Sequence, residues 1–174
     1  MTEYTNAPNA YTNLSGTNYA KGLYIADSAS ILYGHQISDV QFYAYRTNTD
    51  SGKTLYARVR NSSGTLKHTF WSMPYNSLST SSGTLTAETS TPYTSGLAVD
   101  DVIVLEVDPA PSTAVLYFGY HSSDNFDSVN TTYTGRNADG TFSSLTDYDS
   151  GFYINTGAAT GGVRLPPPPA FVRI

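Results

Sequence analysis

Hydrophobic and polar residues alternate most regularly between residues 36 and 107. Apolar side chains fall on every second position in two stretches, at Val40, Phe42 and Ala44 and again at Leu55, Ala57 and Val59. This spacing places them on one face of a β-strand. The opposite face then carries Gln41, Tyr43, Tyr45, Tyr56, Arg58 and Arg60. An apolar inner face and a polar, aromatic outer face predict one layer of an antiparallel β-sandwich, with these tyrosines and arginines together on its outside.

The same pattern predicts an all-β chain. Strands are expected at residues 19–26, 36–46, 54–61, 65–71, 84–91, 102–107, 114–120 and 151–155. Turn-forming residues at 62–64 and 108–112 predict two hairpins, which join 54–61 to 65–71 and 102–107 to 114–120. Both strands of the second hairpin are apolar on both faces, so we expect them to lie centrally or beneath a loop. No stretch has the three-to-four spacing of apolar residues that predicts a helix.

The chain of 174 residues is expected to form one domain between two extended arms. A chain of this length can bury roughly 70% of its unfolded surface without help from a metal or a disulfide. Residues 1–18 lack periodicity and are assigned to an N-terminal arm, residues 19–156 to a jelly-roll-like sandwich, and residues 157–174 to a C-terminal arm.

The C-terminal arm contains a run of prolines, which favours a stiff polyproline II rod, followed by an apolar tip. Such a rod is better shaped to reach a neighbouring subunit than to fold back on its own domain, which is the alternative. The predicted anchor consists of Leu165, Pro166, Pro167, Pro168, Pro169, Phe171, Val172 and Ile174. The expected partners are other copies of the chain or other proteins of the same assembly.

Composition narrows the function classes. Only 13% of the residues are charged, against about 25% in an ordinary domain, and there are 15 tyrosines and no cysteine. Such a surface is common in proteins that work outside cells or pack against one another. The net charge of −5 and the absence of a Lys/Arg run argue against nucleic acid and against an anionic membrane surface.

The N-terminal sequence has neither a basic segment nor an apolar segment, so it does not predict a secretory signal. Two explanations reconcile this with the extracellular composition. The protein leaves the cell by lysis, as virion proteins do, or a signal or larger parent has been removed.

No catalytic signature is present, so the chain is not expected to be an enzyme, to carry a cofactor or to hold a metal. The histidines lack metal-ligand spacing, and no GxSxG or glycine-rich phosphate loop occurs. Asp124 with Asp127, and Asp147 with Asp149, offer oxygen ligands without the spacing of a calcium loop. A glycosidase needs two carboxylates at a defined separation in space, and the sequence does not show that separation.

Exposed aromatic residues are the remaining candidates for recognition. Rings of this kind stack on sugars, and tyrosine with arginine forms protein–protein hot spots. The candidate glycan or protein contacts are Tyr43, Tyr45, Tyr56, Arg58 and Trp71. The alternatives are that Trp71 fills the core and that an arm or a loop covers the tyrosines.

Residues 21–154 resemble a loose group of jelly-roll β-sandwich domains. The resemblance is carried by ISDVQFYAYR followed by TLYARVRNSSGTL, by LAVDDVIVLEV and by DYDSGFYI. These domains occur in phage and archaeal virion proteins, such as decoration and fibre proteins, and in secreted carbohydrate-binding or adhesive proteins. The resemblance implies a structural virion protein (capsid decoration, head fibre or tail component) that is made in the host cytoplasm and assembles through its arms. The alternative is a carbohydrate-binding or adhesin module of a secreted, extracellular protein. No site residues are implied.

Overall fold

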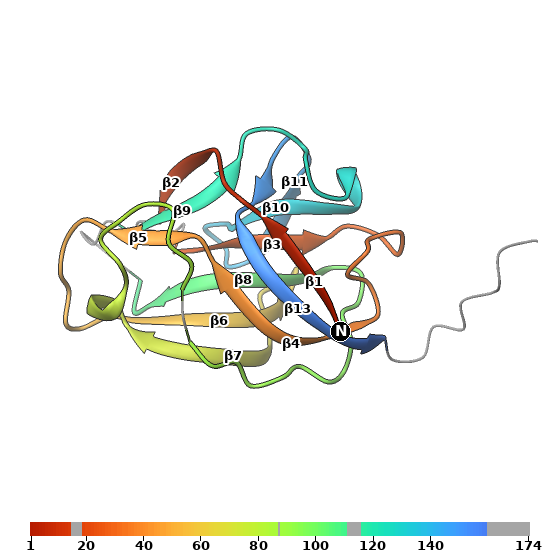
Figure 1. The fold of residues 1–174 in the computed structure, drawn as a ribbon, viewed down its shortest axis with the longest axis horizontal. Helices are drawn as coiled ribbons and strands as arrows, with labels where there is room; N and C mark the ends of the chain where they lie inside the picture. The colour runs from red at the N-terminus through yellow and green to blue at the C-terminus, as the bar shows by residue number, and fades with distance from the viewer. Residues whose placement is uncertain (15–18, 87, 111–115, 160–174) are drawn as a thin grey trace, which may run out of the picture.

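The computed structural model describes residues 1–14, 19–86, 88–110 and 116–159. These residues form antiparallel β-sheets in two packed layers, as Figure 1 shows, with only two short 3-10 turns at Tyr75–Ser77 and Ser128–Asn130. The predicted all-β, antiparallel sandwich is confirmed at this level. Over the described ranges, no helix has the length and apolar character needed to cross a membrane.

One layer is a single six-stranded sheet. Its spatial order is β11 (Phe142–Leu145), β10 (Thr131–Arg136), β3 (Ala20–Ile25), β8 (Asp101–Asp108), β6 (Thr54–Asn61) and β7 (Leu66–Pro74). The central strand β8 sends Ile103, Leu105 and Val107 into the main core, while Val102 and Val104 belong to a small second core on the other face. Burial on both faces explains its continuous run of apolar residues.

The opposing layer consists of two smaller sheets. In the first, β13 (Phe152–Ala159) lies between β1 (Thr2–Asn6) and β4 (His35–Phe42). In the second, β9 (Leu116–His121) pairs with β2 (Ala10–Leu14), β12 (Asp149–Ser150) and β5 (Ala44–Arg46).

The two smaller sheets meet at a fork built by three backbone hydrogen bonds. Gly119 N donates to Tyr43 O at 2.7 Å, Gly151 N donates to Gly119 O at 2.8 Å, and Tyr43 N donates to Gly151 O at 3.3 Å. A Cβ on Gly119 would lie 2.8 Å from Pro8 Cγ, and one on Gly151 would lie 2.8 Å from Gly119 O. The strands come together here only because both positions lack a side chain.

The main core lies between the layers. Phe42 from the first small sheet packs on Phe118 from the second, with ring centroids 5.6 Å apart. Trp71 of β7 is only 5% exposed, and its indole Nε1 donates to Val40 O of the opposite layer at 2.8 Å. Trp71 therefore ties the layers together inside the protein. The prediction that Trp71 is a surface contact is therefore wrong.

The expected N-terminal arm is not confirmed over the described residues 1–14. β1 pairs along β13 and β2 pairs along β9, so both belong to the sandwich. Leu14 is fully buried, and the buried amide of Asn6 donates to Ser150 O at 3.0 Å. At the other end, β13 runs past the expected boundary at residue 156, to Ala159. The predicted anchor, Leu165 to Ile174, lies outside the described residues.

Two predicted arrangements of strands and one predicted strand are wrong. The stretches 36–46 and 54–61 lie in opposite layers, because the chain crosses between sheets after Arg46. β8 and β9 do not form a hairpin: β8 pairs with β3 and β6, and β9 pairs in the other layer. The stretch 84–91 contributes only an isolated bridge, Tyr43 to Leu85, among its described residues. The hairpin of β6 and β7 and the strand at 19–26 are confirmed.

Candidate functional site

The predicted contact residues do not share one face. Tyr45 lies in β5, next to the buried Ala44, and Tyr56 and Arg58 lie in β6, next to the buried Ala57. Because β5 and β6 belong to opposite layers, Tyr45 points outward on one side of the sandwich and Tyr56 on the other. Tyr43 sits at the fork between the small sheets. The structure therefore separates the predicted surface into two.

On the side of the small sheets, Tyr45 packs among other tyrosines. Its ring stacks on Tyr117 with centroids 4.8 Å apart and meets the edge of Tyr11 at 5.2 Å. The hydroxyl of Tyr11 accepts a hydrogen bond from Gly83 N at 2.7 Å. In the Tyr45–Tyr117 pair, each ring therefore has one face covered by the other ring.

On the opposite side, Arg58 belongs to a cluster around one carboxylate. The Glu106 side chain is 4% exposed. Arg60 donates a hydrogen bond to each of its carboxylate oxygens, from Nε to Oε2 at 2.9 Å and from Nη2 to Oε1 at 3.0 Å. Arg58 Nη1 lies 3.2 Å and Arg136 Nη1 lies 3.7 Å from Glu106 Oε1. The Arg58 guanidinium also lies over the Tyr56 ring, 3.7 Å from its centroid. The cluster joins β6, β8 and β10, so we interpret it as a structural tie.

A separate pocket of about 220 Å³ opens where the two layers part. It is lined by Thr12, Lys21, Tyr120, Tyr133, Leu145 and Tyr148. The first layer contributes β3, β10 and β11, and the other layer contributes β2 and β9. In Figure 1, β2, β9, β10 and β11 lie in the upper part of the molecule, and β3 lies below them. Concave sites with a few converging polar groups are where small ligands usually bind. We refer to this site as the Lys21 pocket.

Strand alternation aims Lys21 into the pocket. Lys21, Leu23 and Ile25 share the inward face of β3, and the two apolar residues are buried in the main core. Tyr133 of β10 faces the same way and is in register with Leu23 on one side and with Leu145 on the other. The lysine thus continues an apolar row to the point where the core ends.

Three tyrosines form the aromatic wall of the pocket. Ring centroids are 6.0 Å apart for Tyr120 and Tyr133, 5.7 Å for Tyr120 and Tyr148, and 6.4 Å for Tyr133 and Tyr148. Tyr133 is 6% exposed, and burial raises the pKa of its phenol. Tyr148, at 40% exposure, lies at the rim, and its carbonyl accepts a hydrogen bond from Tyr133 N at 2.9 Å. The wall is therefore buried at its base and accessible at its edge.

The ammonium group of Lys21 has an incomplete set of partners. Its Nζ donates to Thr12 Oγ1 at 3.1 Å and lies 5.7 Å from the centroid of the Tyr133 ring. Burial lowers the pKa of Lys21 to about 8. Among the ion pairs of the described residues, none involves Lys21. A negative charge placed beside this partly buried ammonium would favour its charged form.

Two of the acidic residues singled out in the sequence, Asp127 and Asp149, take structural roles. Asp149 is 2% exposed and accepts hydrogen bonds from the backbone N–H groups of Asn125 and Phe126. Asp127 accepts from Ile31 N at 2.7 Å and from Thr131 Oγ1 at 2.9 Å. Within the part of the chain that the structure describes, no group of three or more His, Asp or Glu side chains is placed to hold a metal ion.

Comparison with protein-family models, with curated proteins and with solved structures finds no match. A function for this chain therefore has to come from its own geometry, and the Lys21 pocket is a concave site formed by described residues. Sequence reasoning singled out none of the pocket residues. The available signal was Lys21 itself, a charged residue on the apolar face of a predicted strand.

Proposed function

We propose that this chain is a carbohydrate-binding β-sandwich domain, without enzymatic activity, that holds one sugar ring in the Lys21 pocket. The observation that carries the proposal is the wall of three mutually contacting tyrosines around a polar base. Within this proposal the sandwich is of the jelly-roll type. Support comes from the six-stranded sheet, where β3 lies between β8 and β10 and its neighbours are thus distant in sequence.

The size and chemistry of the pocket favour a sugar ring. A volume of about 220 Å³ is below the roughly 300–1,000 Å³ of pockets for drug-sized ligands, so it suits a single ring. Tyrosine offers an apolar face for the C–H groups of a sugar and a hydroxyl for its polar rim. The hydroxyl of Thr12 and the ammonium of Lys21 add hydrogen-bonding groups at the base.

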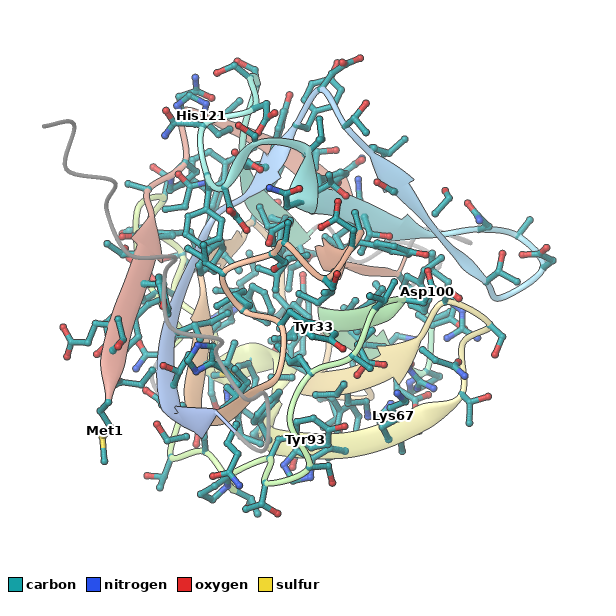
Figure 2. All side chains as sticks on the ribbon, turned by 90° about the vertical axis from the view of Figure 1, so that its right-hand side faces the viewer. Met1, Tyr33, Lys67, Tyr93, Asp100 and His121 are labelled. Carbon is teal, nitrogen blue, oxygen red and sulfur yellow. The ribbon has the colours of Figure 1, made fainter. Side chains whose placement is uncertain are left out.

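Removing the rim tyrosine should weaken binding without unfolding the protein. We expect Tyr148→Ala to reduce the affinity for a bound monosaccharide by about tenfold, because one wall of the pocket is lost. Isothermal titration calorimetry with glucose, galactose and their uronic acids measures this. Tyr33→Ala is the matched control, because Tyr33 is 44% exposed and lies outside the pocket, well away from His121 at the end of β9 (Figure 2). Equal losses in both variants, or no binding by the wild-type protein, would contradict the proposal.

As a second candidate, we propose that the domain is displayed on a virion, as a decoration, fibre or tail protein, and is attached by its C-terminal segment. The supporting observation is the position of β13, which lies between β1 and β4 and is paired on both edges. The proline run begins further along the sequence, at Pro166, and is followed by the apolar residues Phe171, Val172 and Ile174. A segment joined to a strand held on both sides transmits its attachment to the whole domain.

Deletion of residues 160–174 tests this attachment. We expect the full chain to form assemblies and the shortened chain to be monomeric, with a melting temperature within about 2 °C of the full chain. Native mass spectrometry and thermal melts provide the two readouts. If the full chain is monomeric at all concentrations, or if its assembly survives the deletion, self-association through this segment is wrong.

A further inference from the structure

We propose that the sugar recognised by the Lys21 pocket is an acidic one, whose carboxylate pairs with the ammonium of Lys21. This inference rests on the proposed function, because it names the class of ligand for the same site. The inference goes beyond the proposed function because a wall of tyrosines alone would accept neutral and acidic sugars alike.

The first step is the missing counter-ion. Burial of a charged amine is costly unless the charge is paired and hydrogen-bonded. Lys21 Nζ has one hydrogen-bond acceptor, Thr12 Oγ1 at 3.1 Å, and no ion pair among the described residues. Lys67, by contrast, has a counter-ion within the protein, because its ammonium group pairs with the buried carboxylate of Asp101. A ligand carboxylate would supply the partner that the fold leaves out at Lys21.

The second step is the lining of the pocket. Besides Lys21, the titratable groups that line it are the phenols of Tyr120 from β9, Tyr133 from β10 and Tyr148 from the loop after β11. The other lining residues are Thr12 from β2 and Leu145 from β11, and none of the six carries a carboxylate. An acidic sugar therefore meets one positive charge and no negative charge at the walls. Its ring can pack on the tyrosines while its carboxylate reaches the base.

The third step is a dependence on pH, which a merely structural lysine would not give to binding. Burial lowers the pKa of Lys21 to about 8, so the free protein carries the charge at pH 6–7 and loses it above pH 8. A bound carboxylate favours the charged form and raises that pKa. By linkage, the affinity for an acidic sugar should be highest below pH 8 and should fall as the pH rises through the pKa of the free lysine.

Calorimetric titrations with glucuronate and glucose test the inference on the full chain. We expect the wild-type protein to bind glucuronate about tenfold more tightly than glucose at pH 7, and to lose about tenfold in glucuronate affinity between pH 7 and pH 9.5. Lys21→Met keeps the aliphatic length and removes the charge, so it should abolish both the preference for glucuronate over glucose and the loss of glucuronate affinity at high pH. Lys53→Met is the control, since Lys53 Nζ contacts Ala110 O away from the pocket, and it should retain the preference.

The outcomes separate the two proposals. Equal affinity for glucose and glucuronate in the wild-type protein would overturn the acidic ligand and leave sugar binding standing. Persistence of the glucuronate preference in Lys21→Met would also overturn it, because the carboxylate would then be bound elsewhere. Binding of neither sugar would overturn the proposed function and this inference together.

Discussion

Replacement of Glu106 by glutamine should lower the free energy of unfolding by about 3–5 kcal/mol, the usual cost of breaking a buried ion pair from one side. Within the described part of the chain, Glu106 is the only acid that forms ion pairs with Arg58, Arg60 and Arg136, whose side chains are 12%, 12% and 19% exposed. Glutamine has nearly the same shape but no charge. The guanidinium groups of Arg58, Arg60 and Arg136 would then repel one another in a poorly hydrated place. For a domain of this size the melting temperature should fall by roughly 6–20 °C.

Glu3→Gln is the matched control for this change. Glu3 lies in β1, is exposed, and accepts one hydrogen bond from the hydroxyl of Tyr153. Its replacement should alter stability by less than about 0.5 kcal/mol. Urea denaturation at pH 7 measures both variants. If Glu106→Gln were as stable as Glu3→Gln, the arginine cluster would not be a structural tie, and its positive charges would need another explanation.

Replacement of Gly22 by alanine should destabilise the domain by more than about 4 kcal/mol, or prevent it from folding. A Cβ on Gly22 would lie 1.9 Å from Ile103 O and 2.8 Å from Val104 Cα, which are backbone atoms of the central strand β8. Backbone atoms cannot rotate away as a side chain can. The clash therefore has to separate β3 from β8, and with it the strand that carries Lys21.

Gly135→Ala provides the comparison within the same sheet. Gly135 lies in β10, next to β3, and the nearest atoms to an added Cβ are 3.9 Å away. This ordinary contact distance predicts a change within about 1 kcal/mol. Circular dichroism of the purified variants, followed by denaturant titration, distinguishes the two. A folded Gly22→Ala protein with wild-type stability would show that β3 and β8 are not packed as closely as described.

The alternation of apolar and polar residues predicted where the strands lie better than it predicted which strands pair with each other. The stretch 54–61 was predicted correctly, because its apolar residues Leu55, Ala57 and Val59 all face one core. Alternation identifies a face, however, and not the sheet that the strand joins. The loop 47–53 is compatible with a hairpin and with a crossing between layers. The prediction that Tyr45 and Tyr56 share a face failed for this reason.

Two of the strands around the pocket, β10 and β2, gave weak sequence signals. β10 contains Thr131, Thr132 and Thr134, which are buried although they are polar. Two of them satisfy their hydroxyls inside the sheet: Thr132 Oγ1 lies 2.6 Å from Ser144 Oγ, and Thr134 Oγ1 donates to Ser143 O at 2.9 Å. Hydropathy alone does not detect a strand whose buried positions are threonines. The first fourteen residues were missed for a related reason, since most side chains of β1 and β2 stay partly exposed.

The site itself depends on long-range register. Thr12, Lys21, Tyr120 and Tyr148 come from four separate segments, which meet only once β3 pairs with β10 and β9 pairs with β2 and β12. No local sequence motif predicts a pocket of this kind. Only the lysine on the apolar face of β3 was visible in the sequence, as a charge where an apolar residue was expected.

Two-dimensional amide NMR of the 15N-labelled protein, titrated with glucuronate, is the most direct test of sugar binding in the Lys21 pocket. We expect saturable shifts of the amides of Thr12, Lys21, Tyr120, Tyr133, Leu145 and Tyr148, and no comparable shifts at Tyr45 or Tyr117 on the outer face of β5 and β9. Shifts confined to that outer face, or a spectrum unchanged at saturating sugar, would contradict the assignment of the pocket as the binding site.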